Sequence, residues 1–194
     1  MKLLGLTGGV GMGKSTAAGF LLSHGVPVVD TDAIARELVR PGEPALVQIK
    51  NSFGSAILTA AGELNRGELA RRVFADASAR LQLEAILHPR IRECWRVQVA
   101  RWRQEKVPLA CVVIPLLFET QAENHFDKII CLACSDNSQR ERLLARGWSL
   151  AQIQQRIAAQ MPVAQKMARA NFVVWTEGTL SVHQQQLTNI VSRL

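Results

Sequence analysis

The octapeptide Gly8-Gly9-Val10-Gly11-Met12-Gly13-Lys14-Ser15 follows a short apolar run, Lys2 to Thr7, and leads into a helical stretch. Its spacing is G-x-x-x-x-G-K-[ST], in which glycines allow the backbone N–H groups to converge on an anion. Lys14 and the helix N-terminus add positive charge, and the Ser15 hydroxyl can ligate Mg²⁺. A buried strand, a glycine turn and a helix in this order predict a loop that binds the phosphates of a nucleoside triphosphate.

Four further short apolar runs are separated by helical sequence; they cover residues 26–29, 109–114, 128–132 and 171–175. Continuous apolar strands that alternate with helices are typical of a parallel sheet with both faces covered. Residues 61–106 contain no such run and are rich in helix-forming Ala, Leu, Glu and Arg. We therefore expect one α/β domain over residues 1–194, with five parallel strands and a helical insertion at about 61–106.

The composition excludes several classes of protein. The chain has 194 residues, of which 48% are hydrophobic and 20% charged, so it is not intrinsically disordered. No run of 18 apolar residues is present, which predicts a protein that does not span a membrane. Four cysteines are typical of a reduced protein rather than of a disulfide framework. We expect a cytoplasmic location.

The formal net charge of +7 is concentrated in two segments. Residues 139–169 contain six basic residues and one acidic residue, and residues 80–106 contain seven basic and three acidic residues. Trp148 is the one aromatic residue of the first segment, so stacking platforms for nucleic acid are lacking and no nucleic-acid partner is expected. A solvated basic surface remains the alternative to phosphate binding.

The first basic segment is predicted to form a helical lid at about 136–170. Arg142 and Arg146 are four residues apart, so a continuous helix would place them on one face. Arginines so placed can stabilise the charge of a triphosphate in a transition state. We expect both to act in catalysis.

Two carboxylates, Asp30 and Asp32, stand where the second apolar run ends. If the chain is still extended there, both point to one face, near the crevice at the carboxyl ends of the strands. Phosphoryl transfer to a hydroxyl requires a proton acceptor and oxygen ligands for Mg²⁺. The third run ends in Ile114-Pro115 without an acid, which shifts these roles to the pair. The alternative is that one of the two caps the following helix.

The predicted loop indicates a nucleotide site without defining the reaction. An Asn-Lys-x-Asp motif, typical of GTPases, and the Leu-Ser-Gly-Gly-Gln signature of transporter ATPases are both absent. At this length a kinase of small molecules or nucleotides is favoured.

Taken together, these motifs resemble those of the dephospho-CoA kinase family over nearly the whole chain. The resemblance starts at the phosphate-binding loop and the acidic doublet. Its more specific parts follow: Leu64-Asn65-Arg66, Val73-Phe74, His88-Pro89-Arg90-Ile91, Pro115-Leu116-Leu117-Phe118-Glu119, Gln139 to Arg142 with Arg146, and Ile157-Ala158-Ala159-Gln160.

The resemblance implies a P-loop kinase with a helical acceptor-binding insertion and a basic lid. It would use ATP and Mg²⁺ to phosphorylate the ribose 3′-hydroxyl of dephospho-CoA. By position, Asp32 would be the catalytic base, beside Lys14, Arg142 and Arg146. Ser15 and Asp30 are the metal ligands expected from the residues themselves, and the sequence leaves open whether Asp30 or Asp32 contacts the metal. The ATP contacts would be Gly11, Met12, Gly13, Lys14, Ser15 and Thr16, and the acceptor contacts Arg66, His88, Pro115, Leu116, Leu117 and Glu119.

Other readings of the motifs stay open. The chain could be another small P-loop kinase, acting on a nucleoside monophosphate or a sugar, or a nucleotide-dependent nucleic-acid-binding protein. A monomer or a weak homo-oligomer is expected.

The chain departs from the family pattern at two places. Asn65 stands where the family usually has Asp, which removes a charge near the expected acceptor site. Ala170-Asn171 replaces a usual Ala-Asp pair, and Trp175 to Gly178 replaces an Asp-Asn region that would lie near the adenine of ATP. Neither change affects Lys14, Ser15 or Asp32.

Overall fold

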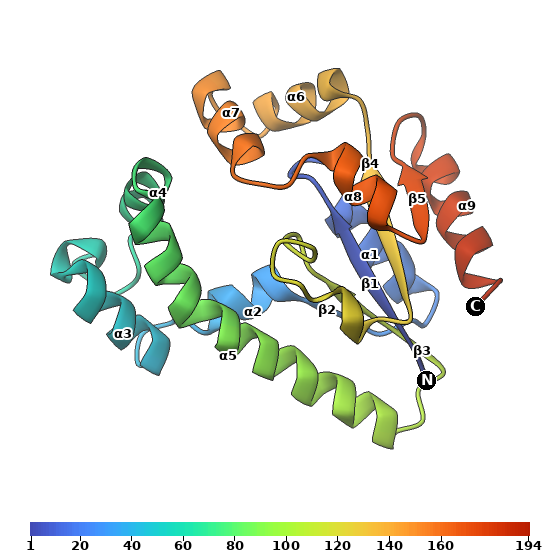
Figure 1. Ribbon diagram of the computed structural model, residues 1–194, viewed down its shortest axis with the longest axis horizontal. Helices are drawn as coiled ribbons and strands as arrows, with labels where there is room; N and C mark the ends of the chain where they lie inside the picture. The colour runs from blue at the N-terminus through green and yellow to red at the C-terminus, as the bar shows by residue number, and fades with distance from the viewer. The chain divides into compact units, whose positions relative to one another are not determined.

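The computed structural model describes all 194 residues, which form two compact units. The first, here called the sheet unit, comprises Met1–Asp30 and Arg101–Leu194. The second, the helical unit, comprises Thr31–Ala100. Figure 1 shows strands in the sheet unit and only helices and connecting loops in the helical unit.

The sheet unit is built on five parallel strands, which confirms the predicted sheet. Their order is β2-β3-β1-β4-β5. Leu4 of the central strand pairs with Cys111 on one side and Lys128 on the other. The strands are β1 (Lys2–Gly8), β2 (Val28–Asp30), β3 (Leu109–Val113), β4 (Lys128–Ala133) and β5 (Phe172–Trp175).

The helices of the sheet unit bury an apolar core against these strands. Leu4 and Leu6 of β1 pack in one cluster with Leu21 of α1 and Leu187 of α9. Gly5 is closely packed, because a Cβ atom there would lie 2.7 Å from Leu117 Cδ1 and would displace that side chain. The helices are α1 (Lys14–Ser23), α6 (Asp136–Leu144), α7 (Leu150–Ala158), α8 (Val163–Arg169) and α9 (Leu180–Val191), with a 3₁₀ turn η2 (Glu123–His125).

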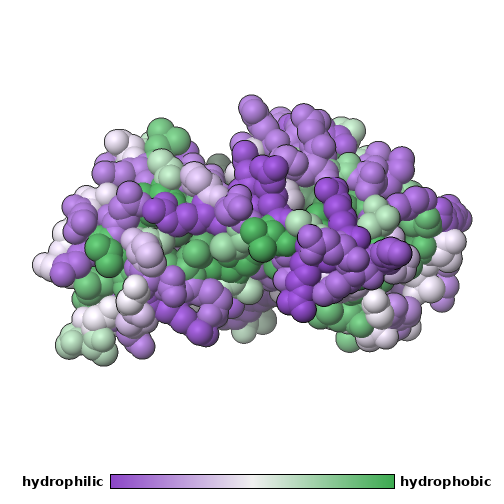
Figure 2. Space-filling model, turned by 90° about the horizontal axis from the view of Figure 1, so that it is seen from below, coloured by the Kyte–Doolittle hydropathy of each residue, from purple (hydrophilic) through white to green (hydrophobic).

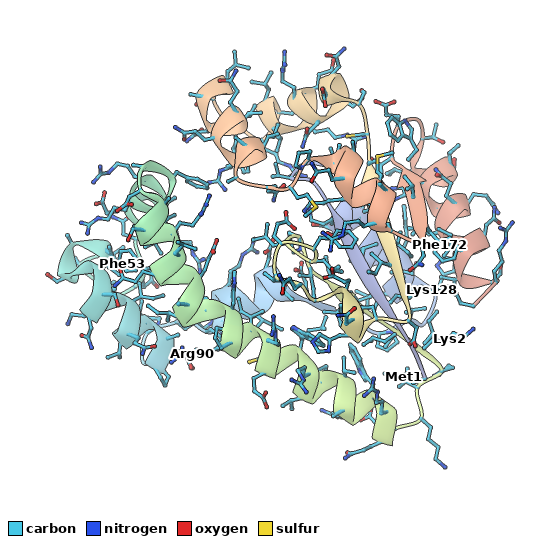
Figure 3. The ribbon with its side chains drawn as sticks, viewed as in Figure 1. Met1, Lys2, Phe53, Arg90, Lys128 and Phe172 are labelled. Carbon is cyan, nitrogen blue, oxygen red and sulfur yellow. The ribbon has the colours of Figure 1, made fainter.

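The helical unit has a core of its own, formed by residues that include Ile49, Phe53, Leu69 and Ile86. Figure 3 labels Phe53 at the end of α3 and Arg90 on α5. Arg90 Nη2 donates a hydrogen bond to Gln48 Oε1 at 2.8 Å. Its elements are α2 (Thr31–Glu37), α3 (Pro44–Phe53), η1 (Ser55–Ile57), α4 (Arg66–Ala75) and the 28-residue α5 (Ala77–Gln104), which ends in the sheet unit.

The predicted insertion at 61–106 contains α4 and α5, whereas the helical unit as a whole begins thirty residues earlier, at Thr31. A single domain with an insertion and a lid remains a prediction.

No helix is both long enough and apolar enough to cross a membrane. Figure 2 shows one face of the molecule, on which hydrophilic residues are widespread and hydrophobic residues appear in patches between them.

Candidate active site

The carboxyl ends of the five strands lie at one edge of the sheet, because all neighbouring pairs are parallel. Lys2, Lys128 and Phe172, labelled in Figure 3, mark the opposite edge, where β1, β4 and β5 begin. In Figure 1, α6 and α7 lie beyond the carboxyl ends of β1 and β4. Ligands of parallel α/β sheets bind at this edge, so it is where the site is expected.

The phosphate-binding loop connects β1 to α1 and depends on two glycine conformations. Gly8 has φ 144°, and a Cβ atom there would lie 2.5 Å from the backbone oxygen of Leu132. Gly13, with φ 84°, is the left-handed N-cap of α1. The helix therefore starts without a side-chain cap and without an acidic residue in its first turn. Its first N–H groups remain available to an anion.

Lys14 places a cation inside this loop. Its Nζ donates to the carbonyl oxygens of Gly8 at 2.9 Å and Gly9 at 2.8 Å. Ser15 is exposed on α1, and Thr16 is half-buried. The Met12 side chain is buried in the core and contributes no surface to a ligand. The loop thus offers backbone donors, one ammonium and one hydroxyl.

The two acidic residues do not share an extended segment, so that expectation was wrong. β2 ends at Asp30, and α2 begins at Thr31. A carboxylate in a first helical turn is favoured by the helix dipole, and Asp32 occupies that position with an exposed side chain. Asp30 pairs in register with Val113 at the sheet edge, whereas Asp32 belongs to the helical unit.

Arg142 and Arg146 do not share a helix face either, because α6 ends at Leu144 and a left-handed Gly147 follows. Arg142 Nη1 donates to Thr176 Oγ1 at 2.9 Å, and Nη2 donates to the Thr176 carbonyl oxygen at 2.5 Å. Arg142 therefore fixes the chain that leaves β5, whereas Arg146 is exposed.

Glu177, next to Thr176, joins the two loops that leave β4 and β5. It accepts hydrogen bonds from the backbone N of Ser135 at 2.9 Å and Ser138 Oγ at 2.7 Å. Ser135 Oγ also donates to it, and Trp175 Nε1 donates to its second oxygen at 2.8 Å. These donors lower the pKa of Glu177 to about 2. The departure from the family pattern at 175–178 thus forms an ionised carboxylate at the N-terminus of α6.

The other departure at β5 preserves a strand contact. Asn171 Oδ1 accepts a hydrogen bond from the Ile129 backbone N at 2.8 Å, and its own N–H donates to the Ile129 carbonyl oxygen at 3.0 Å. An Asp would offer the same acceptor with an added charge, so Asn is sufficient here.

The segment Pro115–Glu119, expected to contact the acceptor, is attached to α8. Lys166 is fully buried; its Nζ lies 2.8 Å from Glu119 Oε1 and donates to the Pro115 carbonyl oxygen at 2.7 Å. Glu119 Oε1 also accepts from the Met161 backbone N at 2.8 Å. The Leu117 side chain has no exposed surface, and Leu116 is half-buried. The segment is consequently held by a buried ion pair.

Arg66 and His88, the other two residues expected to contact the acceptor, lie in the helical unit. Arg66 is the exposed first residue of α4, whose N-cap Asn65 accepts a hydrogen bond from the Glu68 backbone N at 3.1 Å. Asn and Asp cap helices about equally well, so the departure at Asn65 preserves the cap. Burial lowers the pKa of His88 on α5, and the Glu84 carboxylate opposes that shift.

The charge count of residues 139–169 overstates the cationic surface. Lys166 is paired with Glu119, and the guanidinium of Arg169 is paired with Glu123. Arg156 stacks 4.3 Å from the centre of the Trp148 ring. Together with Arg142, which binds Thr176, four of the six basic residues are therefore engaged within the sheet unit.

Sequence reasoning missed several polar residues that shape this edge. In the sequence Lys166 stands out only as part of the basic segment, although it lies three positions after Val163 and so on the same side of a helix. Gln139 and Gln160 were noted only within motifs, yet both bind the phosphate-binding loop. No local pattern marks such long-range contacts.

A phosphate-binding loop at the carboxyl edge of this five-stranded parallel sheet defines a P-loop kinase. The solved dephospho-CoA kinase of Campylobacter jejuni shares the fold, with a TM-score of 0.72 at 24% identity over 100% of this chain and 97% of that one. A solved structure from Thermus thermophilus has a TM-score of 0.84 at 34% identity, with 100% and 97% coverage.

Sequence comparison then defines the family. The dephospho-CoA kinase family model matches residues 2–181. The dephospho-CoA kinase of Anaeromyxobacter dehalogenans is 46% identical over 92% of this chain and 85% of its own length. The chain belongs to the dephospho-CoA kinase family, whose members use ATP to phosphorylate the 3′-hydroxyl of dephospho-CoA, giving coenzyme A. The predicted kinase class and family are confirmed.

Proposed function

We propose that this chain carries out the family reaction at the carboxyl edge of its sheet, with ATP bound by residues 11–16. The observation that carries the proposal is the uncapped, glycine-initiated start of α1 with the Lys14 ammonium inside the loop. The N–H groups of the first turn would hold phosphate oxygens. The Lys14 ammonium would exchange loop carbonyls for the β and γ phosphates and balance the charge that develops in transfer.

The donor set at this edge fits Mg²⁺ bound together with ATP. No group of three His, Cys, Asp or Glu side chains that could hold a metal ion by itself is present. Mg²⁺ in kinases uses one or two protein oxygens in addition to substrate phosphates and water, and the Ser15 hydroxyl and the Asp30 carboxylate are of that type. When bound, the ion would neutralise phosphate charge.

Asp32 is proposed as the base that accepts the proton of the ribose 3′-hydroxyl. It is exposed and separated from Asp30 by one residue. An exposed carboxylate can orient a hydroxyl through its oxygen and accept its proton as the bond to phosphorus forms. Arg66 and His88 of the helical unit, with residues 115–117 and Glu119, would contact dephospho-CoA.

Arg146 is proposed to balance phosphate charge directly, since its side chain is exposed. Arg142 would act in the same region, and its bonds to Thr176 would fix the loop expected beside adenine. We further propose that residues 136–170 form a lid. The protein would be cytoplasmic and a monomer or a weak homo-oligomer, and it would have no nucleic-acid or membrane partner.

A coupled ADP-release assay with an acceptor panel tests it. We expect turnover with dephospho-CoA and none with nucleoside monophosphates or sugars. Asp32→Asn should retain ATP binding while turnover falls by at least about 100-fold, the lower range for a general base. Asp76→Asn, at the end of α4, is the matched control and should be fully active. Full activity of Asp32→Asn would remove the base role.

A further inference from the structure

One residue of the phosphate-binding loop, Val10, is held through both of its backbone polar groups. Its N–H donates to Gln160 Oε1 at 3.0 Å, and its carbonyl oxygen accepts from Gln139 Nε2 at 2.6 Å. Val10 is half-buried, and Gln139 is buried with 4% of its surface exposed. Buried polar groups need partners, so both bonds constrain where this part of the loop can lie.

The two glutamines come from different ends of one segment. Gln139 lies in the first half of α6, whereas Gln160 lies just after α7. The residues between them include Arg142 and Arg146. The intervening chain is therefore attached near both of its ends to the same residue, Val10.

The orientation of each amide follows from the backbone groups it meets. A peptide N–H can only donate, and a carbonyl oxygen can only accept. Gln160 must consequently present its oxygen, and Gln139 its NH₂ group. The two side chains have the same composition but opposite roles, which makes them separable by substitution.

The packing around Gln139 supports the same contact. A Cβ atom at Gly9 would lie 3.2 Å from Gln139 Nε2 and 2.9 Å from Met12 Sδ. One turn further along α6, Leu143 Cγ would lie 3.0 Å from a Cβ atom at Gly11. Gly9 and Gly11 thus allow α6 to lie directly on the loop.

We propose that Gln139 and Gln160 are positioning residues for ATP. They hold residues 9–11 of the loop in the shape that binds phosphate, and they couple the loop to the segment that carries Arg142 and Arg146. This inference depends on the proposed role of the loop in binding ATP. Neither glutamine touches the reacting atoms, and neither adds charge to the loop.

A pair of charge-matched variants tests the inference. In Gln160→Glu the carboxylate still accepts from the Val10 N–H, whereas in Gln139→Glu it cannot donate and faces the Val10 carbonyl oxygen. Both add one negative charge beside the backbone of Val10, so their difference reports the hydrogen bond. Since one such bond is lost, we expect KM for ATP to be about tenfold higher in Gln139→Glu than in Gln160→Glu, with KM for dephospho-CoA changed much less.

A second readout does not depend on nucleotide. In the ATP-free full-length protein, hydrogen exchange of the Val10 amide should be faster in Gln160→Met than in wild type, and as slow as wild type in Gln160→Glu. Gln154→Glu, at an exposed position of α7, is the control for added charge and should match wild type in both readouts.

The results separate the two claims. Equal ATP KM values for the two Glu variants, or unchanged Val10 exchange in Gln160→Met, would overturn the positioning role of Gln139 and Gln160. A lower unfolding midpoint with unchanged KM for ATP would also overturn it, because the residues would then be merely structural. If Lys14→Met leaves both turnover and KM for ATP unchanged, the proposed ATP role of the loop fails instead, whatever the Val10 exchange shows.

Discussion

The phosphate-binding loop, residues 8–15, and the basic segment, residues 139–169, both belong to the sheet unit but are shaped by different interactions. The loop takes its form from glycines and from the start of α1, which are neighbours in sequence. The basic segment takes its form from contacts to distant residues, such as Glu119 with Lys166 and Thr176 with Arg142. A sequence motif can therefore predict local backbone geometry, whereas the tertiary structure decides whether a charged side chain is free to bind a ligand.

Gly8→Ala tests the dependence of the phosphate-binding loop on local backbone geometry, and it should have the largest effect on stability. The new Cβ would lie 2.5 Å from the Leu132 carbonyl oxygen at a φ of 144°. We expect the free energy of unfolding, measured in urea, to fall by about 3 kcal/mol or more from strain and steric overlap.

Gly19→Ala in α1 is the matched control. A Cβ there meets no atom within 4 Å, so this change should raise the free energy of unfolding by about 0.5–1 kcal/mol. Equal effects of the two substitutions would contradict a backbone requirement at Gly8.

Lys166→Met tests the dependence of the basic segment on tertiary contacts, and it should have the next largest effect on stability. It leaves the Glu119 carboxylate, whose Oε2 is buried and has no hydrogen-bond partner, without its cation. Removal of one partner of a buried pair costs about 3 kcal/mol, which urea unfolding would detect.

The double variant Lys166→Met with Glu119→Gln should recover part of this loss, since a neutral amide can still accept from Met161. Lys128→Met, at an exposed position, should change stability by no more than about 0.5 kcal/mol. If Lys166→Met behaves like Lys128→Met, the ion pair does not hold the 115–119 segment.

Glu177→Gln should have the smallest effect, and that effect should depend on pH. The folded pKa of Glu177 is about 2, below the ordinary value of 4.5. A lowered carboxyl pKa stabilises the fold fully above about pH 4.5, and the contribution is lost as pH falls through about 2. Thermal unfolding midpoints should therefore differ between wild type and variant at pH 7, and the difference should shrink below about pH 4.5 and vanish as pH falls through about 2. A difference independent of pH would mean that the charge of Glu177 is unimportant.

Much of the sheet could be predicted from the sequence, because each strand is a short apolar run bounded by glycine, proline or polar residues. The phosphate-binding loop could also be predicted, since Gly8, Gly13, Lys14 and Ser15 act through conformations set by their neighbours. The family resemblance followed from motifs spread along the chain. Each of these features is specified either by residues that are adjacent in the sequence or by residue types at fixed positions of a motif.

Other features depended on where elements end and what they meet. The extended reading of residues 30–32 failed because α2 begins at Thr31, immediately after β2. The shared face of Arg142 and Arg146 failed because α6 ends at Leu144. The buried state of Lys166 and the amide contacts of Gln139 and Gln160 need partners far away in the chain, which no local spacing specifies.

Phosphoryl transfer by wild type and by Lys14→Met tests most directly whether the loop is the site of the family reaction. The product of ATP and dephospho-CoA would be identified by mass spectrometry and ³¹P NMR. In wild type we expect one coenzyme A, phosphorylated at the ribose 3′ position, for each ADP released. Lys14→Met should keep its unfolding midpoint and lose at least about 100-fold in turnover, as for loss of one donor to a transition-state charge. Unchanged transfer in Lys14→Met, or release of ADP that does not require dephospho-CoA, would contradict the assignment.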